Sequence, residues 1–449
     1  MPNLKWLLSG ILTAGLLLAS NPVVAVPEIQ HWRTANGVPV YFIAARELPM
    51  VDAQILFDAG SARDGERPGL AMLTNSSLEE GAGDWSADVI ADRLERVGAR
   101  LGTSSRRDSA VVSLRSLTEP RYLQPAVDTV ARLLKEPTFA PEALNRVRQQ
   151  MLTALQGRAQ SPGAIAQDAF YQALYVSHPY GSPPHGTAAS LNAITRDEVR
   201  DFHRRHYTVA NVVVAIVGDL DRSGAEQLAD ALVGGLPEGE TIPPPPPVPA
   251  LTASQTLRIP HPASQSHLLI GQVGISRADP DYHVLYLGNH ILGGGGLVSI
   301  LAQEIREQRG LAYSAYSAFS PMRQAGPFLM NLQTRNDQVD TALEVAQTTL
   351  RAFTTDGPEV QVLEEARQNI TGGFALNLAG NRNLANYLGV IAFYGLPLDY
   401  LENFIGVMNG MTLEQVRTAW QRHVQPERLV TVIVGGEPVP LAAPTQPDS

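Results

Sequence analysis

Six of the ten histidines fall in pairs whose spacing could bring two imidazoles to one metal ion. These pairs are His203 with His206, His178 with His185, and His283 with His290. Imidazole nitrogens are common zinc ligands, and thiolates or carboxylates usually complete such sites. The sequence contains no cysteine, so any metal site would have to be built from histidine and carboxylate side chains.

The first two pairs also have ordinary structural interpretations. His203 and His206 lie three residues apart on one expected helix, but they flank Arg204–Arg205, whose positive charge opposes a divalent ion. We therefore expect a solvated helix face there. His178 and His185 bracket a proline-rich loop, which we expect to be rigid and to pack against the neighbouring domain.

The third pair lies on a mostly apolar helix expected over residues 282–292, which leads into four glycines. His283 and His290 are two helical turns apart without an accompanying carboxylate, so we expect structural histidines. Gly293–Gly296 could suggest a phosphate-binding loop, but such a loop needs a following Lys-Ser/Thr or a βαβ context. Leu297–Val298–Ser299 follows instead and is expected to open a helix, so nucleotide binding is not expected.

The elements that must position these residues mix strands and helices. Strands are expected over residues 40–43, 51–57, 110–117 and 212–217, which are rich in β-branched and apolar residues. Helices are expected over residues 69–78, 86–97, 140–155 and 195–207. The mixture lacks a strict βαβ alternation and therefore favours an α+β fold of sheet and helix layers.

A proline-rich segment divides the chain into two halves. Five consecutive prolines, Pro243–Pro247, cannot donate backbone hydrogen bonds, so we expect a semi-rigid linker over residues 239–256. It separates domains over residues 26–238 and 257–436, and the proline-rich tail over 437–449 is expected to be flexible.

The two halves carry the same pattern near their ends, at a constant offset of 217 residues. Thr195 matches Thr412 and His206 matches His423, and the register continues without a gap into the strand that follows. Agreement over one ungapped window indicates a duplication, so we expect two homologous sheet-plus-helix domains.

The N-terminus and the composition indicate export. Lys5 precedes a mostly apolar run that ends in small residues, which predicts a signal peptide over residues 1–25, cleaved near Ala25. The run is too short to span a membrane, so no stable anchor is expected after cleavage. The absence of cysteine and an apolar content of 44% are consistent with a periplasmic protein with large cores. A net charge of −10 with dispersed basic residues argues against a nucleic-acid partner.

Four passages resemble the pitrilysin/insulinase family of zinc metallopeptidases, which is built from repeated α+β domains. These are the stretch from Phe57 to Arg63 with Pro68–Ala71, His178–Gly181, Val217–Asp219, and Leu292–Gly296 with Glu304–Ser314. They lie in both halves, so the resemblance covers nearly all of the chain after the signal peptide.

The resemblance implies an inverted zinc motif, His-x-x-Glu-His, on the helix that follows Gly69–Leu70–Ala71. Two histidines bind zinc there, the glutamate is the general base, and a later glutamate completes the site. In this chain Met72, Asn75 and Ser76 stand at the three motif positions. The helix over residues 140–155 that should carry the last ligand has Glu142 as its only carboxylate. We therefore expect no metal and no cofactor in this chain.

The second half retains another feature of the resemblance. In this family an arginine and a tyrosine seven residues apart bind the substrate backbone and stabilise the tetrahedral intermediate, and Arg306 and Tyr313 occupy these positions. The alternative is that Arg306 belongs to a surface charge cluster and Tyr313 to the core.

Small members of the family often work as pairs of one zinc-bearing and one Arg/Tyr-bearing subunit. The expected role is thus the non-catalytic, substrate-binding subunit of a periplasmic heterodimeric peptidase, inactive alone, with zinc in the homologous partner and peptides or unfolded segments as substrates. Two alternatives remain: a stand-alone zinc peptidase with an unrecognised metal site, and a structural or peptide-binding envelope protein.

Overall fold

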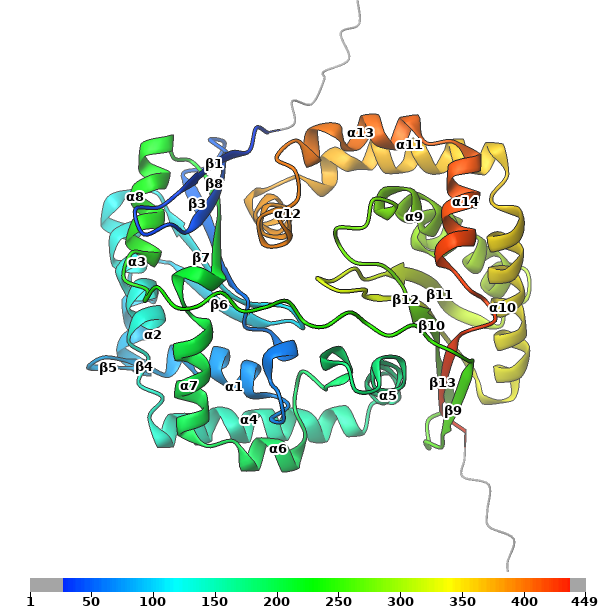
Figure 1. Cartoon of the computed structure of the whole chain (residues 1–449), viewed down its shortest axis with the longest axis horizontal. Helices are drawn as coiled ribbons and strands as arrows, with labels where there is room; N and C mark the ends of the chain where they lie inside the picture. The colour runs from blue at the N-terminus through cyan, green and yellow to red at the C-terminus, as the bar shows by residue number, and fades with distance from the viewer. Residues whose placement is uncertain (1–26, 437–449) are drawn as a thin grey trace, which may run out of the picture.

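Two β-sheets, one in each half of the chain, organise the protein, and helices cover both (Figure 1). The computed structural model describes residues 27–436. The expected signal peptide and the expected flexible tail lie outside the described residues. In the described part of the chain, no helix has the length and apolar character that crossing a membrane requires.

The first sheet is antiparallel except for one parallel pair, β2 with β8. Its spatial order is β1 (Gln30–Arg33), β2 (Pro39–Ala44), β8 (Val212–Gly218), β3 (Met50–Phe57), β7 (Ala110–Leu117) and β6 (Arg100–Ser105). All four strands expected from the sequence are present. A two-stranded hairpin, β4 (Gly81–Ala82) with β5 (Trp85–Ser86), lies beside the sheet.

The second sheet repeats this topology. Its spatial order is β11 (Ala312–Phe319), β12 (Pro327–Arg335), β10 (Gln265–Val273), β13 (Val430–Val434) and β9 (Gln255–Ile259). Only β9 and β13 are parallel, as β2 and β8 are in the first sheet. β9 already begins at Gln255, inside the expected linker.

Eight α-helices belong to the first half and six to the second among the described residues. The first eight are α1 (Leu70–Ser76), α2 (Ala87–Glu95), α3 (Pro120–Lys135), α4 (Pro141–Ala159), α5 (Pro162–Tyr175), α6 (Ala188–Ala193), α7 (Arg196–His206) and α8 (Arg222–Val233). The others are α9 (Tyr282–Asn289), α10 (Val339–Asp356), α11 (Val360–Asn377), α12 (Asn381–Tyr394), α13 (Tyr400–Gly410) and α14 (Leu413–His423). The α9 helix ends before residue 292, because the chain widens into a π-helical segment, His290–Gly294.

The duplicated window is reproduced in three dimensions. α7 and α14 both span eleven residues, and each begins with a capping box, at Thr195 with Glu198 and at Thr412 with Gln415. In such a box the threonine side chain and the residue three positions later satisfy free N–H groups of the first turn. The same local chemistry thus starts the same helix twice, before β8 and before β13.

The two halves exchange one helix each. α5 of the first half packs on β10 and β13 of the second sheet, and α12 of the second half packs on β3 and β8 of the first (Figure 1). Phe170 of α5 joins a core cluster with Val432, and Leu388 of α12 joins one with Val217. α5 begins at residue 162 and α12 at residue 381, a separation close to the 217-residue offset of the duplication. The two helices are therefore equivalent elements of the two halves, and the exchange is reciprocal.

The linker is bound to both halves. Arg63 donates to the carbonyl oxygen of Pro243 (2.8 Å), and His178 Nε2 lies 2.8 Å from that of Pro246. From the second half, the Gln324 side-chain amide donates to the carbonyl oxygen of Pro245 (2.7 Å). These contacts hold the extended segment against the junction of the halves.

Candidate functional site

The α1 helix carries the three motif positions, and a buried carboxylate fixes its start. Asp64 accepts hydrogen bonds from the backbone N–H groups of Gly69 (2.8 Å) and Ala71 (2.7 Å). Gly69 has a φ of 93°, a left-handed conformation that glycine adopts readily. Burial raises the pKa of Asp64 to about 7, although the two N–H groups oppose this shift.

Asn75 is a structural residue at the position of the general base. It is 1% exposed, and its Nδ2 donates to the carbonyl oxygens of Ser104 (2.9 Å) and Val111 (3.4 Å). Its Oδ1 accepts from the hydroxyl of Tyr207 (3.1 Å). The amide thus connects α1 to β6, β7 and the end of α7. The two carbonyl oxygens favour a hydrogen-bond donor at this position and would repel a carboxylate.

The side chains at this position do not fit a zinc ion. Met72 offers a thioether, which suits softer metals, and Ser76 offers an uncharged hydroxyl. On α4, the buried residues are all apolar, whereas Glu142 is exposed at the first turn; they are Ala143, Leu144, Val147 and Met151. Two histidines and a carboxylate are therefore replaced by groups that zinc does not select.

Arg306 and Tyr313, the pair indicated by the resemblance, lie next to each other. Arg306 belongs to a π-helical segment, Ala302–Glu307, and Tyr313 to the edge strand β11. The Arg306 guanidinium carbon lies 4.7 Å from the centre of the Tyr313 ring, which is a cation–π contact. Arg306 also pairs with Glu307 (3.2 Å), as the surface-cluster alternative foresees. Tyr313, however, is 80% exposed and does not belong to the core.

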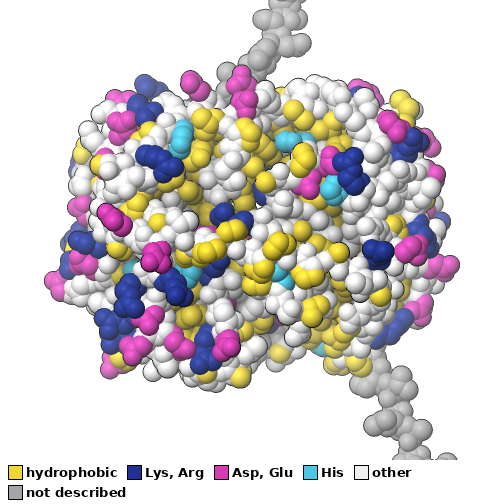
Figure 2. Space-filling view, viewed as in Figure 1, with side chains coloured by type: hydrophobic (Ala, Val, Ile, Leu, Met, Phe, Trp, Pro, Cys, Tyr) yellow, Lys and Arg dark blue, Asp and Glu magenta, His cyan; other side chains and the backbone are white. Residues whose placement is uncertain are grey.

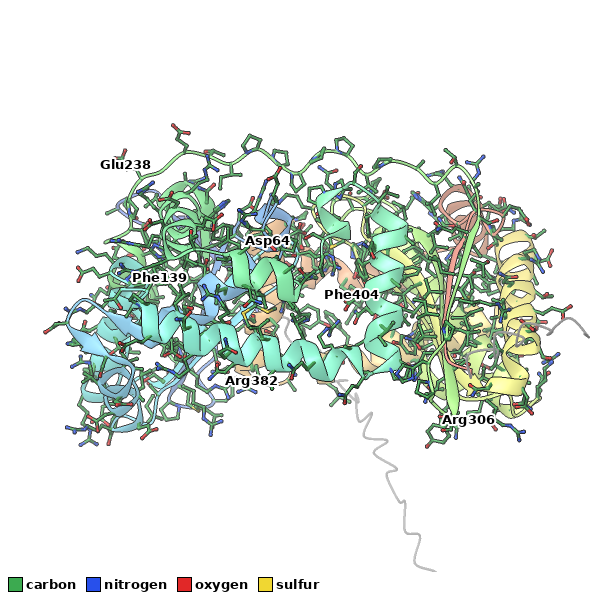
Figure 3. The ribbon with its side chains drawn as sticks, turned by 90° about the horizontal axis from the view of Figure 1, so that it is seen from below. Asp64, Phe139, Glu238, Arg306, Arg382 and Phe404 are labelled. Atoms are coloured by element: carbon green, nitrogen blue, oxygen red, sulfur yellow. The ribbon has the colours of Figure 1, made fainter. Side chains whose placement is uncertain are left out.

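The glycine-rich segment allows this arrangement. A Cβ atom on Gly293 would lie 2.4 Å from the backbone nitrogen of Ser317 in β11, so only glycine permits this close approach. Figure 3 shows Arg306 at the outer edge of the second half, whereas Asp64, which fixes α1, lies in the interior of the first. Arg306 and the start of α1 therefore lie in different parts of the molecule.

The histidine pairs are structural, although the expected solvated face for the first pair is wrong. His203 contacts the carbonyl oxygen of Leu134 (3.0 Å), and His206, 5% exposed, contacts that of Asp58 (3.0 Å). Burial lowers the pKa of each to about 4. The flanking arginines suggested solvent, but the imidazoles themselves point inward.

The other histidines follow their structural interpretation. His178 is buried and contacts the linker, and His185 lines a cavity between the two halves. His283 packs between aromatic rings, 5.1 Å from Tyr400 between ring centres. His290 lies in the π-helical segment, so it is not two regular turns beyond His283.

One cluster escaped the sequence analysis. Asp279, Asp281 and His423 bring ligand atoms within 4.8 Å of one another, and no other such group of three occurs within residues 27–436. However, Asp281 Oδ2 accepts from both Arg422 (2.6 Å) and His423 (2.8 Å), so a guanidinium already neutralises it. Asp281 and His423 are 142 positions apart in the sequence, so no local spacing indicated this cluster.

Comparison with known proteins agrees with this geometry. Residues 42–188 match the family described as Insulinase (Peptidase family M16), and residues 193–370 match Peptidase M16 inactive domain. A crystal structure of a peptidase M16 inactive domain from Pseudomonas fluorescens is 39% identical, with a TM-score of 0.88, covering 91% of this chain and 98% of that one.

Two more distant relatives carry different descriptions. A non-peptidase homolog, YmxG, from Helicobacter pylori is 25% identical over 89% of this chain and 92% of its own length. An uncharacterized zinc protease, YmxG, from Bacillus subtilis is 23% identical over 86% and 94%. The helix with Met72, Asn75 and Ser76 agrees with the first description. This chain therefore belongs to peptidase family M16, as a member of the inactive type.

Proposed function

We propose that this protein is the non-catalytic, substrate-binding subunit of a heterodimeric zinc metallopeptidase in the periplasm. Its partner would be a homologous subunit that carries an intact His-x-x-Glu-His motif and the zinc ion. Its substrates would be peptides or unfolded segments enclosed between the two subunits. The chain itself would bind no zinc and would have no activity alone.

The pair of half-buried Arg306 and exposed Tyr313 carries this proposal. A tyrosine that is 80% exposed and stacked under an arginine contributes little to folding, and it lies at the start of β11, the edge strand of the second sheet. The guanidinium can donate to peptide carbonyl oxygens, and the phenol can donate to an oxyanion that develops on a substrate held by the partner.

The α1 helix supports the same division of labour. Asn75 uses its amide to connect α1 to three other elements of the first half, so this position now serves stability. This chain retains the Arg306–Tyr313 pair, whereas its α1 helix has a structural role in place of a catalytic one. It is therefore suited to supply substrate-binding groups to a subunit that holds the zinc ion. The expected signal peptide supports a periplasmic location.

Co-purification tests the proposal. The mature chain is expressed with a tag beside a family member that has the intact motif, and cleavage of a quenched fluorescent peptide is measured for each subunit alone and for the mixture. We expect a stable complex that is active only when both are present. Activity and tightly held zinc in this chain alone would support the stand-alone peptidase instead. A stable complex whose activity does not depend on this chain would support a structural role.

A further inference from the structure

A cavity at the junction of the two halves has an unusual charge balance. It has a volume of about 420 Å³ and borders Met72, the position of the first motif residue. Three arginines line it: Arg106 and Arg107 from the β6–β7 turn, and Arg277 from the loop after β10. Asp108 is the only carboxylate residue in the lining.

Asp108 forms no salt bridge with these arginines, because its oxygens accept hydrogen bonds from other groups, and its single charge offsets only part of the three guanidinium charges. Its Oδ1 accepts from the hydroxyl of Tyr180 (2.5 Å), and its Oδ2 accepts from the hydroxyl of Tyr394 (2.9 Å) and the backbone N–H of Arg323 (2.8 Å). These bonds tie the β6–β7 turn to α12 and to the β11–β12 turn. The carboxylate is therefore part of the cavity wall.

The arginines, in contrast, have free capacity. Within residues 27–436, none of the three forms a salt bridge with a carboxylate. Arg107 donates one bond, from Nε to the carbonyl oxygen of Tyr180 (2.9 Å), and stacks over Tyr171 at 3.5 Å. Arg277 stacks over Tyr282 at 4.4 Å, and its buried Nε has no hydrogen-bond partner among the described residues. A buried donor of this kind is costly unless a ligand or a water molecule satisfies it.

The walls of the cavity are fixed before any ligand arrives. The backbone N–H of Ala62 donates to the carbonyl oxygen of Arg107 (2.8 Å), and that of Arg277 donates to the carbonyl oxygen of Met322 (2.7 Å). Apolar side chains complete the lining, among them Met72, Met322 and Val390. On the face drawn in Figure 2, hydrophobic side chains gather near the centre with basic ones among them. The lining thus combines cationic and apolar side chains.

We propose that this cavity binds the C-terminal carboxylate of a peptide whose last residue is apolar. Guanidinium groups match carboxylates in geometry, and the apolar wall accommodates the adjoining side chain. The choice of a peptide as ligand rests on the proposed function, whereas the site itself belongs to this chain alone. Met72 of α1, at the first position of the zinc motif, would then border a subsite that binds the C-terminal end of a substrate or product.

Binding to the isolated mature chain tests this site without any partner subunit. The probe is a fluorescent pentapeptide that ends in leucine, prepared with a free C-terminal carboxylate and as the amide, and its Kd is measured by anisotropy. We expect the free acid to bind at least about tenfold more tightly, as the loss of charge-assisted hydrogen bonds implies. Arg106→Gln and Arg277→Gln should each weaken the free acid by about tenfold or more. Arg258→Gln, an exposed control that pairs with Asp340, should change nothing.

Three results would overturn the assignment. They are equal affinity for acid and amide, unchanged affinity in both cavity variants, and displacement of the peptide by inorganic phosphate at equal concentration, which would indicate a simple anion site. Arg106 is exposed, so its variant stays informative if Arg277→Gln fails to fold. This assay measures the affinity of the isolated chain, whereas the proposed heterodimer is tested by the activity of mixed subunits, so failure of this site and failure of the proposed heterodimer are separable.

Discussion

Restoring a carboxylate at the position of the general base should destabilise the protein. In Asn75→Glu, the new carboxylate replaces an amide that donates to the carbonyl oxygens of Ser104 and Val111 at a position 1% exposed. Both donated bonds are lost, and a negative charge faces two acceptors. The matched control is Asn75→Gln, which has the same length as the glutamate and keeps the donor group.

The expected magnitude follows from these contacts. The additional methylene costs about 1–3 kcal/mol in a packed core, and both variants share this cost. An uncompensated buried charge adds about 3–5 kcal/mol in the glutamate variant alone. Unfolding entropy is about 2.1 cal/mol/K per residue, so a chain of this size loses roughly 1 °C in Tm per kcal/mol. We therefore expect Asn75→Glu to melt about 3–5 °C below Asn75→Gln.

Thermal unfolding followed by circular dichroism measures this difference as a function of pH. The buried glutamate should have a raised pKa, so its deficit should be largest at neutral pH and should shrink as acidification neutralises it. Equal Tm values for the two variants at pH 7, or a deficit that persists unchanged in acid, would refute the role assigned to the Asn75 amide.

Three further predictions concern metal, catalysis and pH. Elemental analysis after dialysis should find no stoichiometric zinc, because the α1 side chains do not form a ligand set; about one retained zinc per chain would contradict this. Arg306→Ala and Tyr313→Phe should each lower turnover of the heterodimer by about 10²–10³, with Tm and elution volume of the complex nearly unchanged; wild-type turnover in both would assign the pair to surface packing. Unfolding free energy should fall as pH drops from 6.5 to about 4, by up to roughly 3 kcal/mol per histidine, because the unfolded state then binds protons that buried His203 and His206 do not. Asp64, whose pKa is raised to about 7, opposes this trend, so the test is whether His206→Gln flattens the measured slope.

Local patterns predicted the elements of the fold well. The window beginning at Thr195 encodes its own cap, apolar face and strand, and its repeat at Thr412 encodes them again, so no distant contact was needed to infer either. The motif positions were also readable, because Met72, Asn75 and Ser76 follow a recognisable Gly-Leu-Ala. The structural role of Asn75 could not be predicted from the sequence, because its partners Ser104 and Val111 come close to it only when β6 and β7 form the sheet.

Contacts between distant segments were the part that the sequence did not predict. An apolar helix pattern such as that of α5 says that one face is buried, but not which sheet covers it. The cavity has the same origin, because Arg106 and Arg277 are separated by 171 residues and meet only when the halves pack together. The alternative that places Tyr313 in the core is wrong, because this side chain is 80% exposed on β11, the edge strand of the second sheet.

The reciprocal exchange of α5 and α12 has a consequence for how the chain can be divided. Cutting the proline-rich linker should not separate the halves, because each fragment keeps a helix inserted against the other fragment's sheet. One half expressed alone would expose the apolar sheet face that the other half's helix normally covers. Its own exchanged helix would also lack the sheet on which it packs. Two copies of such a half could cover each other's exposed sheet faces by exchanging this helix, so a single half is expected to dimerise. The present chain has the form of such a dimer whose two halves are joined by a linker.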